Sequence, residues 1–241
     1  EINKNLNNIL PKNEVIAIIE FCIGQVFFET EENGQAYEWF LKSKNSFSDS
    51  EIVNFKEIGF RIALYSNLGF LMISREEIKE GLEILQLGEL LYNQNIENIK
   101  LESIISISLT SLLEFTQKRI GSEINIIKLP FYEKAQNIHL IENSYTLILF
   151  YLAQTWSKLD RRDLTSMYAA NTLKRQVNEY YSYDFSIDFA DCSNNCIGLA
   201  KYFALDQNFA QALHFVDIGL EMVSVNQFPI ETGILLLHKG M

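Results

Sequence analysis

The sequence predicts an all-α fold in which helices pair and stack into a right-handed superhelical solenoid. Apolar residues recur every three or four positions along most of the chain, as at Ile62, Tyr65, Leu68 and Met72, which is the spacing of one helix face. No stretch shows the sustained alternation of a β-strand. Only 3 prolines and 11 glycines occur among 241 residues, so the turn density of an all-β protein is missing.

A repeated pattern of large and small residues indicates helical hairpins of the tetratricopeptide (TPR) type. In the first helix of such a hairpin, a large residue precedes a small one, and another large residue follows three positions later. In the second helix, a small residue is followed by a large one after four positions and by another small one after three more. Small residues are needed where the two helices cross closely, because larger side chains would push them apart.

Four segments of the chain match this pattern with one internal spacing. They are Ile23-Gly24, Phe27, Ala36, Phe40 and Ser43; Leu68-Gly69, Met72, Gly81, Leu85 and Gly88; Leu152-Ala153, Trp156, Thr165, Ala169 and Thr172; and Leu199-Ala200, Phe203, Ala212, Val216 and Gly219. Because the same offsets recur four times, the pattern predicts hairpins over about 14–47, 55–95, 141–180 and 188–224.

Two further segments complete a single solenoid domain over 1–241. Residues 96–120 are apolar and rich in serine, which predicts an additional helix after the second hairpin; this inserted helix and the loop after it cover 96–140. Pro229 is typical of a helix start, so 229–241 predicts the beginning of a further unit. Because that unit is cut short and the chain does not start with Met, we expect a fragment of a longer protein.

The charge balance narrows the classes of partner. The chain carries 31 acidic and 20 basic residues, for a net charge of -11. A surface of one negative sign is unfavourable for nucleic acid or an anionic membrane and favours a basic protein surface. No apolar run reaches the roughly 18 residues that a membrane span needs. We therefore expect a protein partner, no nucleic acid and no membrane span.

No residue pattern indicates catalysis, a metal or a cofactor. A glycine-rich phosphate loop, an HExxH motif and a CxxC motif are all missing from the sequence. The histidines are dispersed and are expected at the surface or at helix ends; they are His139, His214 and His238. The sequence therefore predicts no enzyme and no cofactor.

Two clusters of polar residues have a functional and a structural interpretation. Cys192 and Cys196 are four positions apart and could be two metal ligands, but zinc needs two more; with Cys22 they are expected to be reduced core residues. The second cluster is an acidic stripe, made of Asp184, Asp188 and Asp191. A paired-carboxylate acid/base site is one interpretation, and a solvated face or a patch for a basic partner is the preferred one.

The candidate binding surface is the concave side of the solenoid, which first-helix positions outside the hairpin crossing should line. The candidate residues are Tyr151, Gln154, Lys158, Gln176, Lys201 and Phe70. The same reasoning adds Phe21, Gln25, Glu29, Ser66, Ser74, Asn194 and Ile197. Tyr151, Gln154 and Gln176 are predicted to contact a helix of the partner. The alternative is that these side chains pack between neighbouring hairpins.

Three stretches carry a resemblance to a known family. They are Ile19-Glu20-Phe21 with Gly24 and Thr30-Glu31-Glu32; Ser66-Asn67-Leu68-Gly69-Phe70-Leu71 with Ser74-Arg75-Glu76-Glu77-Ile78; and Tyr151-Leu152-Ala153-Gln154 with Thr172-Leu173-Lys174-Arg175-Gln176. They resemble the first three repeats of the kinesin-binding protein family (KBP), over roughly 15–223. The blocks 75–78 and 173–176 lie outside the general TPR pattern, so they discriminate between families. The resemblance departs at 96–140, where the family has a long polar loop.

The resemblance implies a non-enzymatic protein whose groove binds kinesin motor domains and blocks their attachment to microtubules. It also implies a cytoplasmic, cytoskeleton-associated location. An acidic chain suits this role, because the surface of a kinesin that meets acidic tubulin is basic. The alternative function is a structural scaffold in a large cytoskeletal assembly, such as the axoneme of a cilium. A chaperone-type grip on a carboxylate is disfavoured, because Phe21, Gln25, Ser66 and Phe70 stand where Lys, Arg or Asn would be needed.

Overall fold

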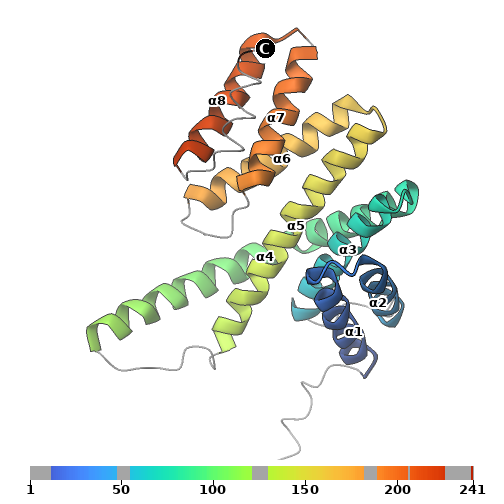
Figure 1. Ribbon diagram of the computed structural model, residues 1–241. Helices are drawn as coiled ribbons and strands as arrows, with labels where there is room; N and C mark the ends of the chain where they lie inside the picture. The colour runs from blue at the N-terminus through green and yellow to red at the C-terminus, as the bar shows by residue number, and fades with distance from the viewer. Residues whose placement is uncertain are drawn as a thin grey trace, which may run out of the picture. The chain divides into compact units, whose positions relative to one another are not determined.

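The computed structural model describes residues 12–47, 55–120, 130–181, 189–205, 207–225 and 240. Within these ranges every regular element is an α-helix, which confirms the all-α prediction (Figure 1). The helices are α1 (Lys12–Glu29), α2 (Asn33–Ser46), α3 (Phe55–Ser74), α4 (Ile78–Ile120), α5 (Pro130–Lys158), α6 (Arg162–Tyr181), α7 (Phe189–Leu205) and α8 (Phe209–Val225). They form two compact units, 1–145 and 146–241, and α5 contributes to both.

The four helix pairs turn in the same way. The turn residue adopts a left-handed backbone in each, at Glu31 (φ 62°), Glu76 (φ 69°), Asp160 (φ 54°) and Gln207 (φ 60°). The N–H of the next residue donates to the carbonyl five positions back, over 2.8 to 2.9 Å, in all four turns. This is the Schellman arrangement, which satisfies the last free carbonyls of a helix. Each turn residue lies seven positions after the small residue of its first helix, so the repeat sets the turn.

Within each hairpin of the first unit, the helices cross too closely for a side chain. A Cβ atom on Gly24 would lie 2.6 Å from the ring of Phe40, which is fully buried. A Cβ atom on Gly81 would lie 3.0 Å from the carbonyl oxygen of Gly69 and 3.2 Å from the backbone nitrogen of Ile73. Backbone atoms cannot move aside as a flexible side chain can. The predicted reason for small residues at these positions is therefore confirmed.

The second unit repeats the arrangement with alanine and threonine in place of glycine. Leu152, Ala153, Leu199 and Ala200 are all buried, as the pattern requires. On the second helices the equivalent buried residues are Ala169, Thr172, Ala212 and Val216. The rings of Phe203 and Phe215 stack 5.4 Å apart and nearly parallel, which joins α7 to α8.

The first half of α5 packs on the first unit. Asn137 donates a hydrogen bond of 2.8 Å to the carbonyl oxygen of Phe55, at the start of α3. Tyr145 stacks on Tyr92 of α4 with ring centroids 3.6 Å apart, and the Tyr92 hydroxyl donates to the Glu142 carboxylate at 3.1 Å. Both rings are buried, so these contacts hold α5 against α3 and α4.

The boundaries of the middle elements differ from the sequence prediction. Residues 96–120 are helical, but they continue α4 as one helix of 43 residues and do not form a separate inserted helix. Between Gly88 and Gly121 the sequence contains neither glycine nor proline, so nothing ends the helix there. Similarly, α5 begins at Pro130, well before the expected start at 141.

Some predictions lie outside the described residues. The loop 121–129 does, and so does the further unit at 229–241 apart from Gly240. The superhelical path stays a prediction. None of the described helices combines the length with the apolar composition that crossing a membrane requires.

The close crossing predicts that Gly81→Ala destabilises the first unit by about 1–3 kcal/mol, because the new methyl group meets two backbone atoms. Gly34→Ala is the matched control, since a Cβ atom there meets nothing within 4 Å. It should change stability by no more than about 0.5 kcal/mol. Urea denaturation monitored by circular dichroism measures both. Equal effects of the two substitutions would contradict the crossing argument.

The left-handed turns predict that Glu31→Gly stabilises the chain by about 0.5–1 kcal/mol, because glycine adopts a positive φ without steric cost. Glu31 is exposed, so little packing is lost. Glu31→Ala removes the same side chain but keeps the Cβ atom, and it should give no gain. A rise in the denaturation midpoint for both variants would show that loss of the glutamate charge, not relief of the turn, stabilises the chain.

Candidate protein-binding surface

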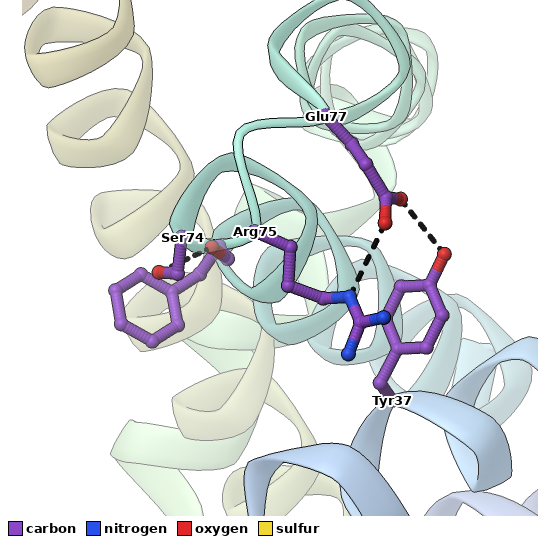
Figure 2. A network of polar contacts seen from close by, with 5 residues as sticks. Tyr37, Ser74, Arg75 and Glu77 are labelled. Carbon is purple, nitrogen blue, oxygen red and sulfur yellow. Dashed lines mark hydrogen bonds and ion pairs between the residues drawn. The ribbon is translucent and has the colours of Figure 1, made fainter.

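The family-like block at 75–78 connects the first hairpin to the second. Arg75 and Glu77 flank the turn residue Glu76, and both reach Tyr37 on α2 (Figure 2). The Tyr37 hydroxyl donates a hydrogen bond of 2.8 Å to one oxygen of Glu77, and the Arg75 side chain donates to the other at 3.2 Å. The Arg75 guanidinium also lies 4.4 Å from the centre of the Tyr37 ring, as a cation–π contact.

This contact shifts the pKa values of both partners. Burial and the hydrogen bond to Glu77 raise the pKa of the Tyr37 hydroxyl. The hydrogen bond from Tyr37, together with that from Arg75, lowers the pKa of the Glu77 carboxyl below its ordinary value. Sequence analysis missed Tyr37, because no general pattern marks the position after the small residue of the second helix.

The second family-like block, 173–176, connects α6 to its neighbours in the second unit. Leu173 is buried, while Arg175 donates a hydrogen bond of 3.0 Å to Thr146 on α5. Gln176 is only 5% exposed, and its side-chain oxygen accepts a hydrogen bond of 3.2 Å from Asn195 on α7. Both blocks that discriminate the family are therefore used to join helices.

Two of the candidate binding residues are taken up by packing. The side chain of Gln176 on α6 is buried against α7. This placement agrees with the alternative interpretation, in which it packs between neighbouring hairpins. Phe70 packs against the core of the first unit, with its ring edge-on to Phe28 at a centroid distance of 5.9 Å. Among the additional residues, Phe21, Ser66 and Ile197 are buried as well, so they line no open groove.

The remaining candidates of the second unit face solvent. Gln154 and Lys158 are exposed one turn apart on α5, and Lys201 is exposed on α7. Tyr151 is half-buried, with its ring 5.7 Å from that of Phe150. These four residues belong to the second unit, whereas Phe70 belongs to the first. The structure thus groups Tyr151, Gln154 and Lys158 along α5.

Polar residues predicted to line the groove of the first unit bond across its hairpins instead. Asn67 on α3 donates a hydrogen bond of 2.7 Å to the side-chain oxygen of Gln25 on α1. The amide of Gln25 in turn donates to Glu29 at 3.1 Å. Glu29 and Ser74 are exposed, and the side chain of Asn194 lies outside the described residues.

A cluster of ionisable residues is buried in the first unit. Glu57 and Arg61 form an ion pair one turn apart on α3, and the Arg61 guanidinium lies 4.9 Å from the centre of the Phe47 ring. Glu14 on α1 is buried nearby. Burial, and to a lesser extent the Glu57 carboxylate, raises the pKa of Glu14 against a lowering by Arg61. All three side chains are buried, so this cluster belongs to the interior of the first unit.

The cysteines are placed differently from one another. Cys196 is buried in α7, as expected, but Cys22 is exposed, so its assignment to the core is wrong. Position 22 lies on the side of α1 that faces away from the buried Ala17 and Phe21. The side chain of Cys192 is outside the described residues.

The other ionisable candidates carry no site where they are described. His139 and His214 are exposed, as predicted, and His238 lies outside the described residues. The side chains of Asp184, Asp188 and Asp191 also lie outside them. Within the described part of the chain, no group of three His, Cys, Asp or Glu residues is arranged to hold a metal ion.

Comparison with known proteins confirms the resemblance to the kinesin-binding family. KIF-binding protein from Homo sapiens is 29% identical over 180 residues, which is 74% of this chain. The Xenopus tropicalis protein is 28% identical over 83% of the chain, and the Danio rerio protein 24% over 87%. The chain spans about a quarter to a third of the length of these relatives, at 26%, 29% and 31%.

The other comparisons add little. No family model matches the chain. A solved structure titled BtubC (BKLC) from P. vanneervenii aligns over 85% of the chain at 12% identity, with a TM-score of 0.37. Such a TM-score is too low to support an argument about fold or function.

The connection between the first two hairpins predicts a pH-dependent effect of Tyr37→Phe. The pKa of Glu77 is lowered in the folded chain, so the stability from this bond is present above the ordinary Glu pKa. It is lost as the pH falls through the folded pKa. The variant should be less stable than the wild type at pH 7, and the difference should shrink as the pH falls below 4.5.

Urea denaturation across this pH range measures the difference. Glu77→Ala is the control, because it removes the acceptor and Tyr37→Phe in that background should add little further destabilisation. If the variant is less stable than the wild type by the same free energy at pH 7 and at acid pH, the assigned role of the Glu77 carboxylate is contradicted.

Proposed function

We propose that this chain is a non-enzymatic, TPR-type solenoid that binds kinesin motor domains and regulates their attachment to microtubules. The observation that carries the proposal is its similarity to KIF-binding proteins over 74 to 87% of its length. The similarity covers about a quarter to a third of those proteins. The proposal therefore assigns kinesin binding to this segment of the relatives.

Features of the described residues support this proposal. The four helix pairs share one turn, and in a repeat protein such pairs present successive helices to a partner. Gln154 and Lys158 are exposed on α5, and Tyr151 on the same helix is half-buried. The net charge of -11 favours association with a basic surface such as that of a kinesin facing tubulin. We infer a cytoskeleton-associated location in the cytoplasm from the same argument.

Affinity purification with this chain as bait, followed by mass spectrometry at low and high salt, tests the proposal. Kinesin motor proteins should be recovered at low salt and released at high salt, because charge complementarity is screened by ions. Recovery of a salt-resistant set of tubulin-associated structural proteins, with no kinesin among them, would contradict the proposal. That result would favour the alternative of a scaffold in a cytoskeletal or axonemal assembly.

The α5 surface predicts that Tyr151→Ala combined with Gln154→Ala weakens binding to a kinesin motor domain by about tenfold or more, because interface energy is concentrated in a few side chains. The melting curve by circular dichroism should remain cooperative. Lys174→Ala, at an exposed position of α6, is the control and should leave the affinity unchanged. Unchanged affinity of the folded double variant, measured by calorimetry, would exclude this surface.

A further inference from the structure

Helix α1 has a second apolar face besides the one in the core. Ala17, Phe21 and Gly24 point into the first hairpin and are buried. At positions on the opposite side of the helix, a row of apolar residues lies open to solvent. The exposed residues are Val15, Ile16, Ile19, Cys22 and Val26. We call these five residues the outer α1 face; Ile19 is 53% exposed and Val26 is 60% exposed.

Helix α2, which pairs with α1, has an exposed side of different composition. None of its exposed residues is a large hydrophobic one; they are Asn33, Gly34, Gln35, Glu38, Lys42 and Asn45. A helix that packs on one side is expected to be polar on the other, as α2 is. Because α1 is apolar on both sides, its outer face is suited to being covered in an assembly.

The size and shape of the outer α1 face fit one helix. Val15, Ile19, Cys22 and Val26 recur at intervals of four, three and four, so they form a row along α1, and Ile16 lies beside it. From Val15 to Val26 the row is about 16 Å long, or roughly three helical turns. Side chains of an amphipathic helix with apolar residues at the same intervals can pack between those of such a row.

The charges beside the outer α1 face indicate which kind of helix would bind there. Glu29 is exposed and borders one edge of the row near Val26, while Glu20 borders the other edge and has one carboxylate oxygen buried. The exposed turn after α1 adds Glu31 and Glu32, and the one Lys or Arg of α1 is its first residue, Lys12. A partner with Lys or Arg beside its apolar row is therefore favoured. A second copy would bring acidic edges together and is disfavoured by the net charge of -11.

We propose that the outer α1 face docks an amphipathic helix with basic edges from another protein. The proposal does not rest on the kinesin assignment. None of the five residues belongs to the candidate α5 surface, which consists of Tyr151, Gln154 and Lys158. It adds a second binding surface in the first unit of the chain.

Two synthetic peptides of about 18 residues test the proposal. Both carry leucine at helical intervals of three and four, and their flanking positions are Lys and Arg in one peptide and Glu in the other. Fluorescence anisotropy measures binding to the full 241-residue chain. The basic peptide should bind at least about tenfold more tightly than the acidic one.

Ile19→Asp should weaken binding of the basic peptide by about tenfold or more. The new carboxylate would strengthen a purely electrostatic attraction, so weaker binding identifies the apolar row as the site. Gln35→Asp adds the same charge on the polar side of α2 and should leave the affinity within about twofold of the wild type. Both positions are exposed, and circular dichroism checks that each variant folds.

Three results would overturn the proposal. The first is unchanged or tighter binding by Ile19→Asp. The second is a wild-type dimer in analytical ultracentrifugation that Ile19→Asp converts to a monomer, which would assign the face to a second copy. The third is a large gain in peptide affinity when residues 1–11 are removed, which would assign the face to the chain's own first residues.

Discussion

The first unit depends on the close crossing of the two helices in each of its hairpins. At Gly69 and Gly81 the two backbones approach so closely that a Cβ atom on Gly81 would lie 3.0 Å from a carbonyl oxygen. The crossing fixes the distance to the turn, and the same turn then follows in every hairpin. The turn of the second hairpin places Arg75 and Glu77 against Tyr37, so the contact between hairpins also follows from the crossing.

The sequence was sufficient for the parts of the fold that obey a spacing rule. Four hairpins and their small residues were predictable because a tight crossing tolerates few side chains. The turns were not predictable, because the residues with a left-handed backbone are Glu, Asp and Gln. A glycine at these positions would have indicated such a turn. The continuation of α4 past 96 also differs from the prediction, because no glycine or proline between 88 and 121 ends the helix.

The candidate site was only partly predictable, because exposure depends on tertiary contacts. Gln154 and Gln176 both lie within family-like stretches, yet one is exposed and the other accepts a hydrogen bond from Asn195 in the interior. A glutamine in a helix carries no local signal that separates these outcomes. The family-like blocks 75–78 and 173–176 join helices in this chain, while binding is proposed for the α5 positions 151, 154 and 158.

The central claim is that hairpin packing determines which side chains remain available to a partner. Hydrogen–deuterium exchange of the chain, with and without a kinesin motor domain, tests it most directly. On binding, hydrogen exchange should slow in peptides that cover 150–158 of α5. It should not change at the crossings around Gly24 and Gly81. Identical exchange with and without the motor domain would contradict the claim that the α5 surface binds the partner. Protection confined to the crossings would contradict it as well.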